Sequence, residues 1–561
     1  MDQTKYKIAY FTMEIGIRNS IPTYSGGLGV LAGDTIKSCA DLEIPLIAIT
    51  MLNEHGYFFQ QITRDGSQTA QPTNWAINDY LELTPAQATI SIQDRQIHIQ
   101  VWQYIVKGET GFEIPVYFLD TNIASNNEFD RHLTSHLYKG GDLEYRLSQE
   151  MVLGIGGYEI IKKLGFANIN KYHMNEGHSA LLTLKLNQDL SHSSTMNCAN
   201  TKPYCIFTTH TPVAAGHDQF PIDMANRFLS HYTDHIPEEV IQNNMFQMTQ
   251  LALHSSGYTN AVSKKHSQVA NNMFPGFNIH SITNGIHPKS WVSAPFAKLF
   301  DKYAPEWRVK PATLTNISQA TDSEISDAHY ISKKKLIDFT NQLSNVGMDN
   351  DFFTICFGRR ITAYKRPDLI LQNPERIAQI NNIRPIQIIY AGKAHPSDME
   401  GQAIIKRINQ IKNDFKNDIK IAYLENYNIK VAKLMTQGGD IWLNNPIPGQ
   451  EASGTSGMKA AINGVPSLST LDGWWEEGWQ EEITGWAINN PEEKIDQYTQ
   501  DELRQRHADT IYEKLEKHIV PNFYNNQALW LSVMRNAIVK NGTYFNSHRM
   551  VQEYWEQAWS K

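Results

Sequence analysis

Short apolar runs rich in β-branched and aromatic residues recur along the chain, and each is followed by Gly, Asn, His or Pro and then by a longer helical pattern. Three of them are IAYFTMEI (8–15), PLIAITM (45–51) and YCIFTTHT (204–211). This alternation predicts parallel strands joined by helical crossovers. A chain built in this way folds as an α/β protein with helices on both faces of its sheets.

A second series of such runs begins after residue 350, with a spacing of about one strand-helix unit. Its members are FFTICFG (352–358), IQIIYAG (386–392), IKIAYLEN (419–426), DIWLNN (440–445) and VPSLST (465–470). Because 561 residues exceed what one hydrophobic core usually supports, we expect two doubly wound domains. The turn-rich segment SITNGIHPKSW (281–291) is the predicted crossing. The expected domains are residues 1–286 and 287–561, with a cleft between them and a helical C-terminal tail packed on the body.

Composition excludes several classes of function. The formal charge of −8 argues against a general nucleic-acid binder. Four cysteines form neither a disulfide framework nor a CxxC metal pattern, so a reducing compartment is expected. The N-terminus has no signal-peptide pattern, and no apolar run approaches membrane-spanning length. The sequence therefore predicts a cytoplasmic protein that does not enter a membrane.

The glycine-rich stretch YSGGLGVLAG (24–33) is the first candidate ligand-binding motif. Gly26, Gly27 and Gly29 enter a helical pattern and would let backbone N–H groups approach an anion closely. A tight turn that needs a positive φ explains the same glycines equally well.

A cationic motif, GRRITAYKRP (358–367), follows the first predicted strand of the second series. It places Arg359, Arg360 and Lys365 between that strand and a helix expected near Pro367. Ligands of doubly wound sheets bind at the carboxyl ends of the strands, so this position favours a phosphate clamp over a solvated basic loop.

The segment EASGTSGMK (451–459) surrounds one lysine, Lys459, with small and hydroxyl residues. A lysine that reacts with a carbonyl group needs a desolvated or cation-rich setting, and nearby hydroxyls could hold a phosphate. Taken alone, the pattern favours an ordinary helix lysine.

Histidines and tryptophans give weaker signals. HMNEGH (173–178) and HTPVAAGH (210–217) lack the HExxH zinc pattern, so contacts with a substrate are expected in preference to a metal. The tryptophans of DGWWEEGW (472–479) could stack on sugar rings, but packing is the favoured interpretation.

Together the motifs resemble the glycogen and maltodextrin phosphorylase family, specifically its shorter bacterial α-glucan phosphorylase branch. The resemblance covers residues 8 to about 480. It is carried by YFTMEIGI, YSGGLGVLAGD, NEGHSALL, FTTHTPV, ITNGIHPKSW, FGRRITAYKRP, YAGKAHP, LENYNIKVA and EASGTSGMKAAING, in this order. It implies a GT-B architecture, in which two Rossmann-like domains face each other across a cleft, and pyridoxal 5′-phosphate bound to Lys459.

The resemblance also implies roles for individual residues. The catalytic set is Lys459, Arg360, Lys365 and His178, and the cofactor is bound by Lys459, Thr455, Gly26, Gly27, Tyr427 and Arg359. The substrate is bound by Asn284, Glu451, Ser453, Gly454 and His210, and no metal is implied. The chain departs from the family at Arg359, where the most familiar form of the motif has lysine. This keeps the charge but changes the geometry.

The implied reaction cleaves the terminal α-1,4 bond of glycogen, starch or maltodextrin with inorganic phosphate and releases α-D-glucose 1-phosphate. The cofactor's phosphate acts as the acid and base, which fits the absence of a compelling pair of catalytic carboxylates in the sequence. Such enzymes are commonly homodimers. Two alternatives stay open: a GT-B glycosyltransferase that uses a nucleotide sugar, and an inactive carbohydrate-binding homologue.

Overall fold

The computed structural model describes residues 2–139 and 141–561, which form two units. The first comprises the chain up to Phe58 together with Pro72–Thr283 and Met550–Lys561, and the second comprises Phe59–Gln71 and Asn284–Arg549. These units depart from a single division at residue 286 in two segments. Strands β3 (Phe59–Ile62) and β4 (Gln68–Gln71) form a hairpin that contacts α14 (Met399–Asp414) of the second unit, and the C-terminal residues return to the first unit.

The first unit is built on a sheet of nine strands in the described chain, in the order β14-β13-β9-β8-β1-β2-β7-β6-β5. The strands from β14 to β7 run parallel, and β6 and β5 complete the sheet as an antiparallel edge. Their bounds are β1 Ile8–Thr12, β2 Leu46–Met51, β5 Glu82–Ile92, β6 Arg95–Lys107, β7 Glu113–Asp120, β8 Lys171–Asn175, β9 Cys205–Thr208, β13 Tyr258–Ala261 and β14 His280–Ser281.

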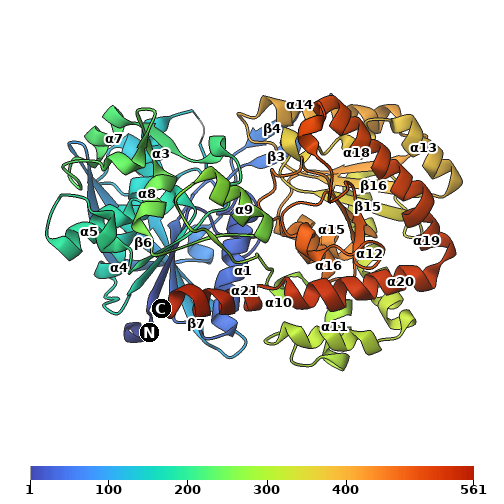
Figure 1. Cartoon of the computed structure of the whole chain (residues 1–561), viewed down its shortest axis with the longest axis horizontal. Helices are drawn as coiled ribbons and strands as arrows, with labels where there is room; N and C mark the ends of the chain where they lie inside the picture. Colours follow the sequence, from blue (N-terminus) through green and yellow to red (C-terminus); the bar gives the residue numbers. More distant parts are fainter. Residues whose placement is uncertain (1, 140) are drawn as a thin grey trace. The chain divides into compact units, whose positions relative to one another are not determined.

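Helices cover this sheet, and the apolar residues of β1 and β2 divide between two clusters, as expected where both faces are buried. Ala9 and Phe11 of β1 join one cluster, whereas Ile8 and Tyr10 join the other. The main helices of the first unit are α1 Gly27–Asp41, α3 Leu143–Met151, α4 Gly157–Lys163, α5 Leu182–Ser191, α7 Ile222–Leu229, α8 Met248–Ser255 and α9 Lys264–Met273 (Figure 1).

The second unit contains a parallel sheet of six strands in the described chain, in the order β17-β16-β15-β18-β19-β20. Numbered from its own first strand, this is the order 3-2-1-4-5-6 of the Rossmann fold. The bounds are β15 Phe353–Gly358, β16 Ile386–Ala391, β17 Lys420–Leu424, β18 Ile441–Asn444, β19 Ser467–Ser469 and β20 Gly485–Ala487. The eight apolar runs named from the sequence all contain a strand, so the expected mixed α/β fold with parallel sheets is confirmed.

Several helices lie around β15 and β16 of this sheet in Figure 1, among them α13, α14, α15 and α18. The helices of the second unit are α10 Pro288–Trp291, α11 Ala294–Tyr303, α12 Asp322–Ser344, α13 Pro374–Ile383, α14, α15 Ile429–Gly438, α16 Ser456–Ala461, α17 Trp475–Gly478, α18 Gln500–Lys514, α19 Val520–Asn525 and α20 Gln527–Asn536. Helix α12, the longest of these, begins at a capping box in which Thr321 and Glu324 satisfy each other's backbone N–H groups. The last helix, α21 (Ser547–Tyr554), carries the chain from the second unit back to the first.

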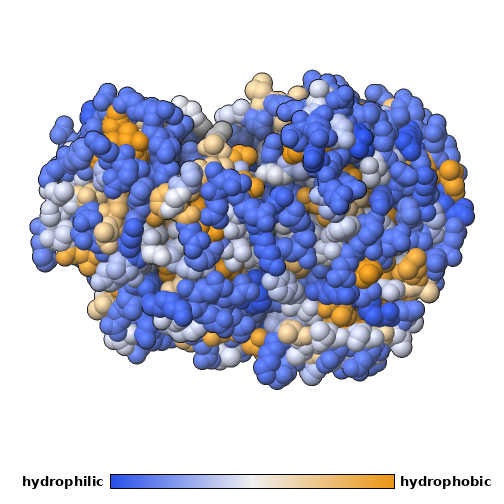
Figure 2. Space-filling view, in the orientation of Figure 1, coloured by the Kyte–Doolittle hydropathy of each residue, from blue (hydrophilic) through white to orange (hydrophobic). Residues whose placement is uncertain are grey.

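Within the described residues, no helix has both the length and the apolar character needed to span a bilayer. Apolar side chains are scattered among polar ones on the face that Figure 2 shows.

Candidate active site

The second unit brings its sequence motifs together at the point where its strand order reverses. Strands β15 and β18 are neighbours, and the chain continues from them toward opposite edges of the sheet. Arg359 follows the last residue of β15, and Asn445 follows the last residue of β18. Loops at such a reversal leave a crevice at the carboxyl ends of the strands, where doubly wound proteins bind their ligands.

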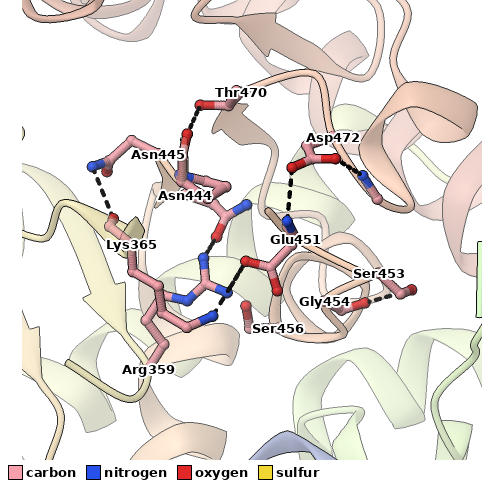
Figure 3. Close-up of polar contacts among 12 residues, drawn as sticks. Arg359, Lys365, Asn444, Asn445, Glu451, Ser453, Gly454, Ser456, Thr470 and Asp472 are labelled. Atoms are coloured by element: carbon pink, nitrogen blue, oxygen red, sulfur yellow. Dashed lines mark hydrogen bonds and ion pairs between the residues drawn. The ribbon is translucent and has the colours of Figure 1, made fainter. Parts of the chain in front are cut away.

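A buried polar cluster occupies this position (Figure 3). The guanidinium of Arg359 donates one hydrogen bond to the side-chain oxygen of Asn444 and another to the Glu451 carboxylate. The Lys365 Nζ lies 3.2 Å from the same Glu451 oxygen. Each of these ion-paired side chains is at most 9% exposed. One carboxylate therefore balances two cations away from bulk water.

The two acids near this cluster titrate in opposite directions. Burial opposes ionisation of Glu451, but Arg359 and Lys365 outweigh it and lower the pKa of Glu451 to about 2. Burial raises the pKa of Asp472 to about 7, and the negative charge of Glu451 adds to this shift. Asp472 accepts the backbone N–H groups of Glu451 and Gly473, both at 2.9 Å. Near neutral pH the neighbourhood therefore keeps an excess of positive charge.

Tyr364 reports the sign of the local potential. Its burial alone would raise the pKa of the phenol. Lys365, Arg360 and Arg359 overcome this effect, and the pKa of Tyr364 is lowered. The Lys365 ammonium also lies 4.7 Å from the centroid of the Tyr364 ring. A half-buried phenol whose ionisation is favoured indicates that this loop would stabilise an added anion.

Lys459 lies on α16 and is buried, with 6% of its surface exposed. Its Nζ is 4.1 Å from the centroid of the Trp291 ring. The side chain of Asn463 donates to the backbone carbonyls of both Lys459 and Trp291, at 2.9 and 3.0 Å. The lysine is thus held against an aromatic face in a confined setting, which is unusual for an ordinary helix lysine.

The remaining residues predicted in the second unit lie on loops around these elements. Thr455 is the N-cap residue of α16, and its side chain makes no capping hydrogen bond. Gly454 has a φ of +72°, and Ser453 Oγ donates to its carbonyl at 3.1 Å. Tyr427 donates to the carbonyl of Gly358 at 2.9 Å, at the end of β15. Arg360 is exposed, unlike Arg359.

Asn284 begins the second unit and is buried. Its backbone carbonyl accepts a hydrogen bond from Arg549 at 3.1 Å. Its side-chain oxygen has no hydrogen-bond partner in the part of the chain that the structure describes. A buried amide oxygen in this state is available to a hydroxyl donor.

In the first unit, a carboxylate lies at the glycine-rich loop. Glu14 accepts hydrogen bonds from the backbone N–H groups of Ser25 and Gly26, at 2.5 and 3.3 Å, and from the Tyr138 hydroxyl at 3.1 Å. Burial raises the pKa of Glu14. The Gly26 N–H that we expected to meet a phosphate therefore has an internal acceptor in this structure. An added Cβ at Gly26 or Gly27 would meet no atom within 4 Å.

The strand order of the first unit also reverses, between β1 and β8. Asn175, at the end of β8, donates to the Thr12 hydroxyl at the end of β1 at 3.1 Å. The His210 ring lies 2.6 Å from the Asn175 side-chain oxygen, and its backbone N–H donates to Glu176 at 2.8 Å. Glu176 has a φ of +72°, a strained conformation that is common at functional sites.

His178 belongs to a buried ionic network. Its Nε2 lies 3.4 Å from Asp218, which pairs with Arg146 at 2.8 Å, and Arg146 lies 3.0 Å from Glu150. Burial and the positive charge of Arg146 lower the pKa of His178 to about 3. Burial and Asp218 raise the pKa of Glu150 well above its usual value. His178 is therefore neutral, and its Nδ1 has no partner among the described residues.

Other expectations from the sequence can be compared with the same structure. The packing interpretation of the tryptophans is confirmed for Trp474 and Trp475, which are buried. In the described chain, His, Cys, Asp and Glu form no group that could hold a metal ion. Sequence reasoning assigned no role to Glu14, Arg146 or Asp472. Glu14 and Asp472 lie within the quoted runs IAYFTMEI and DGWWEEGW, but their carboxylates were not singled out, and Arg146 lies outside the quoted motifs.

Two mainly parallel sheets with polar side chains gathered where their strand order reverses are typical of α/β enzymes that bind phosphorylated ligands. The sequence profile of the carbohydrate phosphorylase family matches residues 219–477. A maltodextrin phosphorylase from Thermococcus litoralis is 36% identical over 99% of this chain and 70% of that protein. A glycogen phosphorylase from Aquifex aeolicus is 32% identical over 100% of this chain and 87% of that protein. An uncharacterized protein from Methanocaldococcus jannaschii is 31% identical over 98% of this chain and 99% of its own length.

The chain therefore belongs to the carbohydrate phosphorylase family. The family resemblance read from the motifs is confirmed, and so is the expected class of glycosyltransferase-type enzyme.

Proposed function

We propose that the protein is an α-1,4-glucan phosphorylase that uses inorganic phosphate to release α-D-glucose 1-phosphate from the non-reducing end of a maltodextrin or glycogen chain. The names of its relatives support this substrate class. The observation that carries the proposal is the pair of cations, Arg359 and Lys365, that share the Glu451 carboxylate at the strand reversal of the second unit. Its positive potential, reported by Tyr364, suits a dianionic reactant.

The same neighbourhood fits pyridoxal 5′-phosphate. Lys459 is buried against Trp291 and would carry the aldehyde group, while the side chains of Thr455 and Tyr427 and the cation Arg359 would hold the rest of the cofactor. When bound, the cofactor supplies a phosphate group that can exchange a proton with the substrate phosphate. Because two phosphates repel each other strongly, the cations must offset that repulsion.

The chain's own residues divide this work. Lys365 and Arg360 bind and orient the substrate phosphate, and Glu451 holds Arg359 and Lys365 in position through its carboxylate. Asn284 offers a buried acceptor to a sugar hydroxyl, as does the loop of Ser453. The family-derived roles of His178, His210, Gly26, Gly27 and Gly454 in substrate or cofactor binding are part of the proposal. The GT-B arrangement of the two units stays a prediction.

The test combines turnover with the site of the cofactor. Purified protein is given maltoheptaose and inorganic phosphate, and glucose 1-phosphate is measured. In parallel, borohydride-reduced protein is digested and searched by mass spectrometry for a phosphopyridoxyl group. We expect release of glucose 1-phosphate and a label on the Lys459 peptide. Lys459→Ala should lose both, with turnover falling by at least the ~10²–10⁴-fold typical of general acid-base catalysis.

A matched control is available in the same aromatic contact. Lys433 also lies over the Trp291 ring, at 5.9 Å, and Lys433→Ala should keep both the label and the turnover. Phosphate-independent transfer from a nucleotide sugar, with Lys459 unlabelled in cofactor-replete protein, would replace the proposal with the nucleotide-sugar alternative. A labelled protein without turnover would indicate an inactive carbohydrate-binding homologue.

A further inference from the structure

Arg366, at the end of the cationic motif of the second unit, has a strained backbone. Its φ is +45° and its ψ is +50°, a left-handed conformation that a residue other than glycine keeps only where its surroundings hold it there. The residue is buried, with 4% of its surface exposed. It directly follows Lys365, one of the two cations that share the Glu451 carboxylate. Whatever holds Arg366 therefore also fixes the point from which the Lys365 side chain extends.

The loop after β18 holds Arg366 from one side. The guanidinium donates to the backbone carbonyls of Asn445 and Pro446, at 2.9 and 2.8 Å. In return, the Asn445 side chain donates to the carbonyl of Lys365, at 3.3 Å, and to that of Arg366 (Figure 3). The backbone N–H of Arg366 donates to the Ala363 carbonyl at 2.9 Å. Both polar groups of the peptide bond between Lys365 and Arg366 are therefore fixed.

Helix α18 holds Arg366 from another side through His507. A guanidinium nitrogen of Arg366 lies 2.8 Å from the Nδ1 of His507. Because a guanidinium can only donate, Nδ1 is the acceptor and the ring proton is on Nε2. The Nε2 then donates to the Glu493 carboxylate at 2.9 Å, which fixes this tautomer. His507 is 1% exposed, so bulk water does not compete for these contacts.

The charge states of both residues suit this arrangement. Burial and the positive charge of Arg366 lower the pKa of His507, so the ring is neutral near neutral pH and keeps its acceptor. Burial, together with the charge of Arg504, lowers the pKa of Arg366 to about 9, which leaves its guanidinium charged at neutral pH. A buried cation that loses one of its acceptors is costly. Arg366 therefore depends on the His507 contact.

Helix α18 also fixes the chain just beyond Arg366. Arg504 lies 2.8 Å from Asp368, and the Tyr512 hydroxyl donates to the carbonyl of Ile370 at 3.1 Å. The helix begins at a capping box of Thr499 and Glu502, which secures its first turn. A helix about 140 residues further along the chain thus supports the cationic motif from behind.

We propose that Arg366 and His507 are positioning residues for the substrate phosphate, because they place the Lys365 ammonium that binds it. Glu493 orients His507. His507 and the loop after β18 hold Arg366 in its left-handed conformation, and the fixed peptide bond passes that placement to Lys365. Both residues act through Lys365 and need no contact with the reacting groups. The identity of the anion as substrate phosphate rests on the proposed function.

His507→Phe tests this role, because it keeps a ring of similar size and removes the acceptor for Arg366. With maltoheptaose and inorganic phosphate as substrates, we expect the KM for phosphate to rise about tenfold or more, the effect of weakening one hydrogen bond to a charged group. The KM for maltoheptaose should stay unchanged. His507→Asn, whose side-chain oxygen can take the place of Nδ1, should restore most of the affinity for phosphate.

The matched control is His329, another buried histidine of the second unit. Its Nε2 lies 2.8 Å from Asp440, which precedes β18 and is at the opposite end of that strand from Asn445. His329→Phe should lower stability without changing the KM for phosphate. Equal KM values for phosphate in His507→Phe and in the unaltered protein overturn the proposal. Equal rises in His507→Phe and His329→Phe overturn it as well.

Glu493→Gln keeps the test decisive if His507→Phe does not fold. The glutamine amide can donate to Nε2 of His507, which moves the ring proton to Nδ1 and removes the acceptor for Arg366. The KM for phosphate should then rise severalfold, and an unchanged value overturns the proposal.

Direct binding separates this proposal from the proposed function. Titration calorimetry of the purified protein with inorganic phosphate measures affinity without turnover. Phosphate binding that weakens in His507→Phe but not in His329→Phe, in a protein that releases no glucose 1-phosphate, would refute the proposed function and leave the positioning role standing. Phosphorolysis whose KM for phosphate does not respond to His507→Phe would refute the positioning role alone. A protein that binds no phosphate would refute both.

Discussion

The Asp472 carboxylate accepts the backbone N–H of Glu451 at 2.9 Å, which places a second acid beside the carboxylate that pairs with Arg359 and Lys365. The two acids lie in the same buried neighbourhood but differ in their charge state. Glu451 stays ionised because two cations contact it, whereas Asp472 receives only backbone N–H groups and takes up a proton near neutral pH. This difference leaves the cation cluster only partly neutralised and therefore able to bind an anion.

Asp472→Asn should flatten part of the pH dependence of stability. The pKa of Asp472 is raised from its ordinary value of 3.8 to about 7, so the folded protein holds this proton more tightly than the unfolded chain does. The stability that protonated Asp472 contributes to the folded protein is therefore present at low pH. The free energy of unfolding falls as the pH rises between about 4 and 7. Denaturant unfolding across this range should show a weaker fall in the variant.

Asparagine is a close isostere and can still accept the Glu451 N–H, so Asp472→Asn should fold. Asp414→Asn, at an exposed position at the end of α14, is the control and should follow the unaltered protein at every pH. If Asp472→Asn also follows it throughout, the raised pKa of Asp472 is wrong.

Arg359→Lys should destabilise the second unit although the charge is kept. The guanidinium of Arg359 reaches Asn444 and Glu451 with separate N–H groups, and a single ammonium cannot reproduce that fork. The expected loss is about 1–3 kcal/mol of the free energy of unfolding, because a buried partner is left unsatisfied. Arg384→Lys, on an exposed arginine of the same unit, should change stability by less than about 0.5 kcal/mol. Equal effects of the two substitutions would show that the fork contributes nothing.

The strands of the second unit and the grouping of its polar site residues could be predicted from the sequence, because both depend on local patterns. Each buried strand is a short apolar run, and Arg359 follows its strand directly, so the strand order alone brings it beside Asn444. The hairpin of β3 and β4 could not be assigned in the same way. Its residues are largely polar, and it groups with the second unit through contacts such as that of Gln60 with the carbonyl of Gly392, more than 300 residues away.

Charge states were beyond prediction for a related reason. The pKa of His178 depends on burial and on Arg146, whose partner Asp218 is 72 residues further along the chain. The spacing of these residues in the sequence does not predict that they contact each other. Likewise, Trp291 meets Lys459 through tertiary packing alone. A motif identifies which lysine to suspect, but the aromatic surface that confines it is visible only in the folded protein.

Acid should weaken the packing of the C-terminal residues 550–561 against the rest of the first unit. His173 is buried, accepts a hydrogen bond from the Trp559 indole at its Nδ1 at 3.1 Å, and contacts the Thr208 hydroxyl through Nε2 at 2.8 Å. Burial lowers the pKa of His173 to about 3. The unfolded chain therefore binds this proton more tightly, and the stability from a neutral His173 is present above pH 6.5 and lost as the pH falls toward 3.

Trp559→Phe tests this contact at neutral pH. Removing the indole N–H leaves a buried ring nitrogen without its donor, at a cost of about 1–3 kcal/mol. Trp555→Phe is the matched control, because the Trp555 indole makes no hydrogen bond within the described residues, and it should cost less than about 1 kcal/mol. Hydrogen exchange of residues 550–561 should rise in Trp559→Phe only. Unchanged exchange would mean that the His173 contact does not hold the helix.

Arg146 should be more important for stability than an exposed arginine with a similar partner. It is 13% exposed and contacts both Asp218 and Glu150, so Arg146→Met leaves the ionised, partly buried Asp218 without a counter-charge and the buried, protonated Glu150 without this contact. Breaking a buried ion pair in this way typically costs about 3–5 kcal/mol. Arg227→Met, which removes a 3.6 Å contact with Glu144 between two exposed side chains, should cost less than about 1 kcal/mol.

The double substitution Arg146→Met with Asp218→Asn separates pairing from packing. Once the Asp218 charge is gone, no unpaired carboxylate is left beside the protonated Glu150, so the double variant should be more stable than Arg146→Met alone. If the double variant is as unstable as the sum of the two single variants, the arginine acts by filling space and not by its charge. In that case burial alone, without the charge of Arg146, would lower the pKa of His178. The pH dependence of the free energy of unfolding would then be the same in Arg146→Met as in the unaltered protein.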